Sequence, residues 1–437
     1  MMLKEPLDTH AKALALNLDP SIFGSFAEIG AGQETARWFL RVGAASGTVA
    51  KTICAYDKAV SDDLYGAGSR YVAKDRLQAM LATEWELLEK QIASRSANVR
   101  SFVFANTIAA RNYAGTNQCH GWLGIQFRHK PNAEPSGILV HVNLWDSTNV
   151  LQQESLGVLG VNLIYGAYYQ SESADTLLSG LGENSGLTHL DIDYIETYGE
   201  LFQGWEQKLL FAKLVCSGLA YGVLLPHQGD YLALNEAFYK TALVVEPGHF
   251  EEEKSIYTVL LNSAVAQLSS LAKSHERSSR AIFCLFADRH DPVTLLDRAE
   301  KLLATGYDVL LTRHAEMYQI SKQLRAFTRQ PLRFVVGLSF VVRLIDAAYS
   351  ELQGRVLEGL GRLFAQDVAM YVHPMSKDLL YRRVPEASLQ GWEIEEAQNV
   401  VEADQVHPPL PLGLLYQYLL TARLIEPLRL LPPDTTE

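Results

Sequence analysis

The segment from residue 278 to 374 alternates short apolar runs with helical stretches, and this alternation constrains the fold more than any other feature of the chain. The runs AIFCLFA, DVLLT, RFVVG and DVAMYVH have the length and composition of buried strands. Strands that alternate with helices form parallel sheets with right-handed crossovers. The amphipathic stretch 254–275 precedes them, so we predict a Rossmann-like or flavodoxin-like domain over residues 251–374.

The rest of the chain has different patterns. Residues 1–100 are predicted to be a helical N-terminal region, with KDRLQAMLATEWELLEKQIA as its clearest amphipathic helix and another helix over 48–60. Residues 101–250 mix strands and helices, and the turn-rich KPNAEPS between two apolar runs predicts an antiparallel hairpin in an α+β domain with a mixed sheet. Residues 375–437 form a Pro-rich tail with one helix. The predicted class is therefore α/β plus α+β.

Charge and cysteine usage restrict the partners and the compartment. The chain has 38 Lys and Arg against 50 Asp and Glu, a net charge of -12, which argues against nucleic acid or an anionic membrane as the main partner. A signal peptide needs a continuous apolar core. In the N-terminal run MMLKEPLDTHAKALALNLDP, polar residues interrupt any such core. The four cysteines are widely spaced and form no CxxC pair, as suits a reducing cytosol. We expect a cytoplasmic protein with no membrane partner.

Polar residues follow the predicted strands of the parallel sheet. In open α/β sheets, ligands bind beyond the carboxyl ends of the strands, and arginines, histidines and helix N-termini there suit an anion. These residues would otherwise cap helices or face solvent, as in any loop of this kind. The predicted ligand residues are Asp288, Arg289, His290, Arg313, His314, Ser339 and His373.

The run His189-Leu190-Asp191-Ile192-Asp193 is a second candidate site. On a strand, His189, Asp191 and Asp193 share one face, and an imidazole with two carboxylates could hold a divalent metal. Neighbours on one face lie about 6.5–7 Å apart, so one ion would require a bend or further ligands. The alternative is a solvated polar face of a half-buried sheet.

The pair Cys119-His120 is a third candidate, because a thiol beside an imidazole can act as a nucleophile. Adjacent side chains rarely point toward each other, so His129 or His141 on the predicted hairpin would have to supply the base. Both histidines are equally compatible with ordinary positions in a sheet.

Several segments together resemble a family of uncharacterised bacterial cytosolic proteins. They include LDPSIFGSFAEIGAGQETARWFLRVGAASGTVAKTICAYD, GTNQCHGWLGIQF, QQESLGVLGVNLIYGAYY, HLDIDYIETYGELF, EAFYKTALVVEPGHF and LEGLGRLFAQDVAMYVHP. The resemblance runs from about residue 17 to 430. Members often carry the label nicotinate-nucleotide adenylyltransferase, and sometimes TonB-dependent receptor. The first label implies an HxGH motif, which this chain lacks, and the second implies a signal peptide and many barrel strands.

Two functions remain open at this point. The polar residues that follow the strands of the parallel sheet favour a protein that binds a small anionic metabolite or nucleotide at the carboxyl edge of that sheet. The alternative is a self-assembling structural protein, favoured by 20 Tyr, 16 Phe and 6 Trp and by the lack of HExxH, GxSxG or a GxGxxG after a strand. Homo-oligomerisation fits both functions. The motifs assign no reaction and no cofactor.

Overall fold

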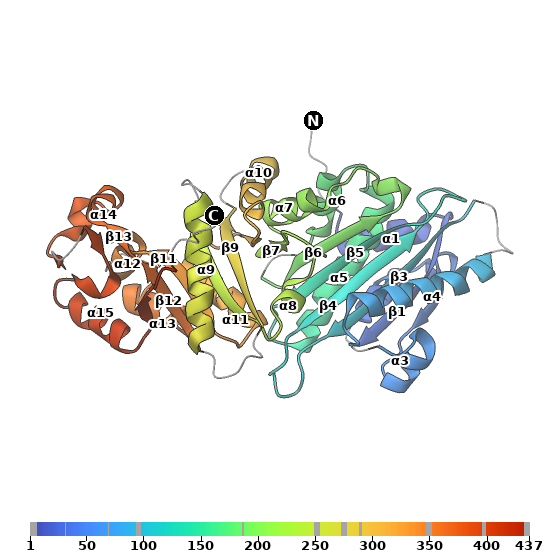
Figure 1. Ribbon diagram of the computed structural model, residues 1–437. Helices are drawn as coiled ribbons and strands as arrows, with labels where there is room; N and C mark the ends of the chain where they lie inside the picture. The colour runs from blue at the N-terminus through green and yellow to red at the C-terminus, as the bar shows by residue number, and fades with distance from the viewer. Residues whose placement is uncertain are drawn as a thin grey trace. The chain divides into compact units, whose positions relative to one another are not determined.

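The computed structural model describes residues 7–30, 32–68, 70–92, 98–185, 188–248, 254–271, 278–287, 291–346, 352–395 and 399–431. The chain divides into two compact units. The first comprises Met1–Val223 with His290–Leu296, and the second comprises Leu224–Arg289 with Asp297–Glu437. Figure 1 shows that each unit is built around its own large sheet.

The first sheet has six strands in the order β2-β1-β3-β4-β5-β6. Its strands are β1 (Ile22–Gly30), β2 (Val49–Ile53), β3 (Arg100–Ala109), β4 (His120–Phe127), β5 (Ser136–Leu144) and β6 (Leu190–Tyr198). β1 pairs in parallel with β2 and β3, and β3 to β6 are antiparallel. One edge therefore collects the carboxyl ends of β1, β3 and β5 with the amino ends of β4 and β6.

Helices cover both faces of the first sheet. The helices of this unit are α1 (Thr9–Leu18), α2 (Glu34–Val42), α3 (Lys58–Tyr65), α4 (Lys74–Ile92), α5 (Asn149–Tyr169), α6 (Ala174–Leu181) and α7 (Gln207–Ser217). On one face, Phe102 and Phe127 pack against Tyr168 of α5 at 6.3 and 5.4 Å between ring centroids. On the other face, Gly124 lies beneath Leu77 of α4, the helix that crosses the sheet in Figure 1.

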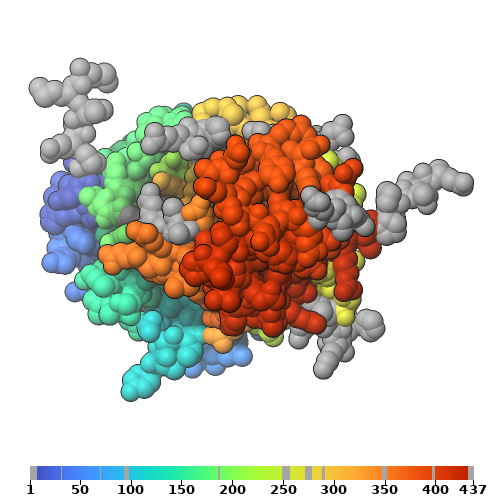
Figure 2. Space-filling model, turned by 90° about the vertical axis from the view of Figure 1, so that its left-hand side faces the viewer, coloured from blue at the N-terminus to red at the C-terminus, as the bar shows by residue number. Residues whose placement is uncertain are grey.

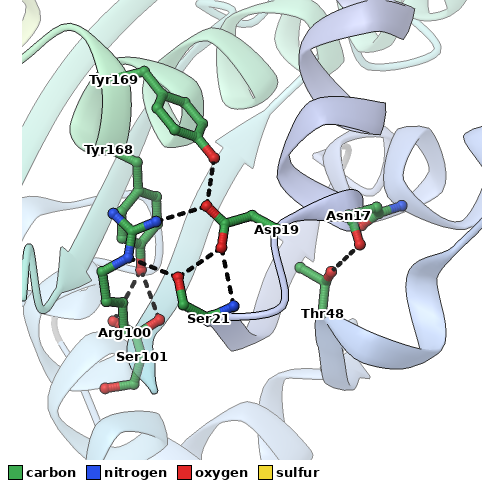
Figure 3. Close-up of polar contacts among 8 residues, drawn as sticks. All are labelled: Asn17, Asp19, Ser21, Thr48, Arg100, Ser101, Tyr168 and Tyr169. Carbon is green, nitrogen blue, oxygen red and sulfur yellow. Dashed lines mark hydrogen bonds and ion pairs between the residues drawn. The ribbon is translucent and has the colours of Figure 1, made fainter. Parts of the chain in front are cut away.

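Polar contacts join the amino ends of β1 and β3 (Figure 3). Arg100 Nη2 donates to Asp19 Oδ2 at 2.7 Å, and Tyr169 donates to the same oxygen at 2.9 Å. Tyr168 Oη donates to the carbonyl oxygens of Arg100 and Ser101. These contacts link the end of α1 and the last turn of α5 to the amino ends of β1 and β3.

The second sheet has seven strands in the order β17-β12-β11-β8-β9-β10-β7. Its strands are β7 (Gly222–Leu225), β8 (Ala242–Gly248), β9 (Ser279–Phe286), β10 (Asp308–Thr312), β11 (Leu332–Gly337), β12 (Val368–His373) and β17 (Ile425–Pro427). The run from β10 to β17 pairs in parallel throughout. Apart from β7, this is the strand order of a doubly wound dinucleotide-binding sheet.

The remaining elements of the second unit cover this sheet and extend it. The helices are α8 (Leu234–Ala237), α9 (Lys254–Leu271), α10 (Pro292–Leu303), α11 (Met317–Phe327), α12 (Leu338–Ile345), α13 (Arg355–Leu363), α14 (Lys377–Arg383) and α15 (Leu412–Thr421). Two short antiparallel pairs join β13 (Met375–Ser376) to β15 (Val400–Val401) and β14 (Glu393–Ile394) to β16 (Val406–His407). α11, α12 and α13 share one apolar core with alternate side chains of the strands.

The predicted α/β class, the hairpin over β4 and β5, and the parallel C-terminal sheet are confirmed. The N-terminal region is not only helical. IFGSFAEIG forms β1, and the predicted helix over 48–60 is instead β2, a loop and the start of α3. The expected boundaries at residues 100 and 250 do not separate the sheets, because β3 pairs with β1 and β8 lies inside the second sheet. The tail also contributes a strand, β17, to that sheet.

None of the helices in the described residues has both the length and the apolar composition needed to cross a membrane.

Candidate functional site

The order of the second sheet places a switch point between β8 and β11. From β8 the chain proceeds to β9 and β10 on one side, and then returns to place β11, β12 and β17 on the other. Connections that leave neighbouring strands in opposite directions open a crevice beyond the strand carboxyl ends, and ligands of open α/β sheets bind there.

A cavity of about 440 Å³ lies at this edge. Its volume falls within the range of about 300–1,000 Å³ that is usual for small-molecule sites. The ends of β8, β9 and β10, the first turn of α11 and the helix α12 surround it. Its apolar wall consists of Pro247, Cys284, Phe286, Ala315, Met317, Ile320 and Phe340. Its polar side chains are Thr312, His314, Glu316, Arg343 and Asp346.

The polar residues that line the cavity differ in charge. Burial, with the charges of Lys322 and Arg313, lowers the pKa of His314 to about 4, so its imidazole is neutral at pH 7. Glu316 caps α11 in a reciprocal capping box with Gln319. The N-terminus of this helix therefore already has a carboxylate as its anion. Arg343 is the cation of the lining, and its guanidinium lies 5.7 Å from the centroid of the Phe340 ring.

The predicted ligand residues that the structure describes do not all lie at the cavity. His314 lines the cavity, whereas Arg313 is exposed and is not part of the lining. Ser339 is buried in the first turn of α12, and His373 ends β12 with its ring near the carbonyl of Pro374. Neither lines the cavity. Asp288, Arg289 and His290 lie outside the described residues.

Sequence reasoning missed Arg343 and Phe340. Both lie on α12, one helical turn apart, so a spacing of three residues places them on the same face. The strand-end rule considers only loops, and it does not reach a side chain one turn into the following helix.

A larger cavity, about 570 Å³, lies in the first unit between α6, β6 and α7. Its lining includes Leu178, Leu219 and the ion pair of Lys213 with Asp175. Size alone would favour it, but it is not at the carboxyl ends of the parallel strands. We therefore place the candidate ligand site in the second unit, on position rather than on volume.

The first sheet also has a switch point, between β1 and β3, where α2 and α4 lie on opposite faces. Here the N-terminus of α2 is occupied by a side chain of the protein. Ala36 N donates to Glu28 Oε2 at 3.2 Å, and Asn106 Nδ2 donates to Glu28 Oε1 at 3.0 Å. Burial raises the pKa of Glu28 to about 7, against the opposing effect of these hydrogen bonds. An internal carboxyl group thus fills the position that an external anion would take.

We expect Glu28 to make the stability of the first unit depend on pH. A carboxyl group with a folded pKa of about 7 and an ordinary pKa of 4.5 favours the folded state below pH 4.5, and this contribution is lost as the pH rises through 7. From pH 5 to pH 8, the unfolding free energy of the wild type should fall by about 2 kcal/mol more than that of Glu28→Gln. Urea denaturation at both pH values measures this, with Glu34→Gln as the control. Equal pH dependence in wild type and Glu28→Gln would refute the assignment.

A chain of buried side chains lies at the same edge of the first sheet. Asp193 Oδ1 is 2.5 Å from His141 Nδ1, and His141 Nε2 is 3.0 Å from His120 Nδ1. His141 and Asp193 are fully buried. The pairing of β5 with β6 shifts register after His141, and Asp193 is the extra residue of this bulge. Bulges re-aim side chains, and this one turns Asp193 toward His141.

The three residues of the predicted metal site each contact a different partner. His189 Nδ1 lies 2.9 Å from Asp146 Oδ1, and Asp191 accepts from Trp145 Nε1 at 2.8 Å. Asp193 is the partner of His141. Within the described part of the chain, no group of three or more His, Cys, Asp or Glu side chains could hold a metal ion.

The structure also shows the surroundings of Cys119, the thiol predicted as a nucleophile. Cys119 Sγ donates to the carbonyl of Asn117 at 3.9 Å, and the neighbouring His120 ring is turned toward His141. The hairpin does place a second imidazole nearby, as the sequence suggested. That imidazole, His141, contacts His120 and not the thiol of Cys119.

Comparison with known proteins shows likeness in structure only. No family model matches the chain, and no curated protein matches it. Among solved structures, CihA from Agrobacterium tumefaciens, a competence/damage inducible protein, is 15% identical with a TM-score of 0.28, and the match covers 38% of this chain and 99% of that one. A competence-damaged protein superfamily member from Klebsiella pneumoniae is 10% identical with a TM-score of 0.28, covering 36% and 96%. A member from Enterobacter cloacae is 11% identical with a TM-score of 0.26, covering 38% and 93%.

Since no family model and no curated protein matches the chain, the two labels implied by the sequence resemblance are not confirmed.

Proposed function

We propose that the second unit binds a small organic molecule that combines an aromatic or apolar body with one anionic group. The observation that carries the proposal is the cavity of about 440 Å³ at the switch point of a doubly wound sheet. Pockets of this kind are mostly apolar with a few polar groups that orient the ligand. Phe286 and Phe340 would contact the apolar body, and Arg343 would pair with the anionic group.

The charges of the lining limit the ligand further. Arg343 is one cation, while Glu316 and Asp346 are two acids in the same wall. His314 adds no charge at pH 7, because its pKa is about 4. A polyphosphate would bring several negative charges toward these two carboxylates, which is unfavourable. A single carboxylate or phosphate monoester is the better match.

Calorimetric titration with AMP and with ATP tests this proposal, because the two share one base and differ in charge. We expect AMP to bind at least about tenfold more tightly than ATP, a difference of about 1.4 kcal/mol. Equal binding of both, or tighter binding of ATP, would contradict a site for one anionic group.

Self-assembly is the second candidate, and the C-terminal segment favours it. Leu410, Leu414 and Tyr418 are 76%, 70% and 63% exposed, around and along α15. Figure 2 shows the C-terminal part of the chain, orange to red, as one continuous surface. Grouped exposed apolar side chains commonly mark contacts between proteins. Light scattering after size exclusion tests this, and a monomer at micromolar concentration would count against it.

A further inference from the structure

We propose that the cavity of about 570 Å³ in the first unit binds a linear amino acid whose ammonium and carboxylate groups lie at opposite ends of an apolar chain. This site is independent of the ligand site proposed for the second unit. Three features carry the proposal: the direction of two helices, the opposite charges at the two ends of the cavity, and the apolar surface between those ends.

The helices α6 and α7 run in the same direction along the cavity. Asp175, in the first turn of α6, forms an ion pair with Lys213 of α7. At the other end of α6, Gly182 lies against Leu219, the residue after the C-cap of α7, and a Cβ at Gly182 would be only 2.8 Å from Leu219 Cδ2. Figure 1 shows the two helices next to each other. The carboxyl-terminal ends of both helices therefore lie at the same end of the cavity.

The end of the cavity at Asp175 is positive. Lys213 lines the cavity with a side chain that is 17% exposed, whereas the side chain of Asp175 is 74% exposed. Water weakens an ion pair with an acid this exposed, so Asp175 can turn to solvent and leave the ammonium group of Lys213 to a ligand carboxylate. The first turn of α6, which is the positive end of the helix dipole, lies at the same place.

The end of the cavity at Gly182 is negative. Glu183 follows this residue and lines the cavity, with its Oε2 at 2.5 Å from Lys12 Nζ, and its Oε1 can accept from a ligand ammonium group. Ser185 also lines this end, and within the described part of the chain its buried Oγ has no hydrogen-bond partner. The carboxyl-terminal ends of α6 and α7 add the negative ends of their dipoles. A ligand group with a positive charge and several N–H donors matches these acceptors.

Apolar side chains join the two ends of the cavity. Leu178 of α6 and Leu190 and Ile192 of β6 are buried and belong to the lining. An α-helix rises 1.5 Å per residue, so Asp175 and Gly182 are about 10 Å apart along α6. With a charge-assisted hydrogen bond of about 3 Å at each end, roughly 4–7 Å remains between the charged groups of the ligand. A chain of a few methylene groups, as in 5-aminopentanoate, fits this distance.

Calorimetric titration of the full chain with four ligands tests the site. 5-Aminopentanoate has both charges and the required length, pentanoate lacks the ammonium group, pentylamine lacks the carboxylate, and glycine has both charges without the length. We expect 5-aminopentanoate to bind with a Kd of about 0.1–1 mM, because both ends of the site are partly exposed, and therefore to be lost during purification. Each of the other three ligands should bind at least about tenfold more weakly.

Variants of the chain locate the site. Lys213→Met should weaken 5-aminopentanoate binding at least about tenfold and leave the affinity for pentylamine unchanged, because only the carboxylate loses its partner. Lys208→Met is the matched control, since Lys208 is on the same helix but does not line the cavity. Ile320→Phe, which fills the cavity of the second unit, should bind 5-aminopentanoate like the wild type. Glu183 is left intact because the buried Lys12 depends on it, and pentanoate tests that end of the site instead.

The four ligands are compared on the wild type, so the proposal does not depend on the stability of a variant. Equal affinity for 5-aminopentanoate and any one of the other three ligands would refute a site with two charged ends at this separation. Absence of binding up to about 10 mM 5-aminopentanoate would refute it as well. Equal losses in Lys213→Met and Lys208→Met would show general attraction to positive charge and overturn the role of Lys213.

Discussion

Replacing Glu183 with alanine is expected to lower the unfolding free energy of the first unit by about 3 kcal/mol, because the change leaves a buried ammonium group without its counter-ion. Lys12 of α1 is fully buried, and its Nζ lies 2.5 Å from Glu183 Oε2. It also donates to Asn162 Oδ1 at 2.7 Å and to the carbonyl of Gly180 at 3.4 Å. Burial already lowers the pKa of Lys12, and Glu183 opposes that effect.

The matched variant is Lys12→Met, which removes the charge and retains an apolar chain of similar length. Its effect should be below about 1.5 kcal/mol, because replacing a buried charge with an apolar side chain avoids the cost of burying it. Urea denaturation at pH 7 measures both variants. A Glu183→Ala variant as stable as the wild type, or a Lys12→Met variant less stable than Glu183→Ala, would contradict this role of the ion pair.

Replacing Arg343 with alanine is expected to weaken AMP binding by about 30- to 100-fold, equivalent to about 2–3 kcal/mol. Arg343 is the cation of the cavity lining, and a charge-assisted bond to the ligand anion would be lost. Calorimetric titration measures the change in Kd.

Arg313→Ala is the matched control for this prediction. Arg313 follows the same sheet edge and carries the same charge, but it is exposed and does not line the cavity. AMP affinity should change less than about twofold in this variant. Equal losses in the two variants would indicate general electrostatic attraction rather than the defined pairing proposed for Arg343.

The periodic elements of the chain could be predicted from the sequence, because their patterns are local. The amphipathic run KDRLQAMLATEWELLEKQIA forms the helix α4 (Lys74–Ile92), as predicted. β1 was missed because all but its last residue are buried, so IFGSFAEIG has no alternation of polar and apolar residues. β2 was missed because VAKTI is short and only partly buried at the edge of its sheet.

The candidate sites were harder to predict, because they depend on contacts between distant strands. The rule for sheet edges led to the edge of the second sheet at which the cavity lies, and to His314, one of its lining residues. It could not identify Arg343, which reaches the cavity from within a helix. Likewise, alternation along β6 grouped Asp191 with Asp193, but the bulge turns Asp193 to His141, a residue on another strand. A register shift of this kind depends on strand pairing and has no signal in a single strand.

Native mass spectrometry of the protein purified without added ligand tests the site of the second unit most directly. We expect one retained small molecule per chain. That molecule should be lost when Ile320→Phe fills the cavity, and kept when Leu178→Phe fills the larger cavity of the first unit. A molecule retained equally by Ile320→Phe, or lost only from Leu178→Phe, would contradict the assignment of the ligand site to the carboxyl edge of the second sheet.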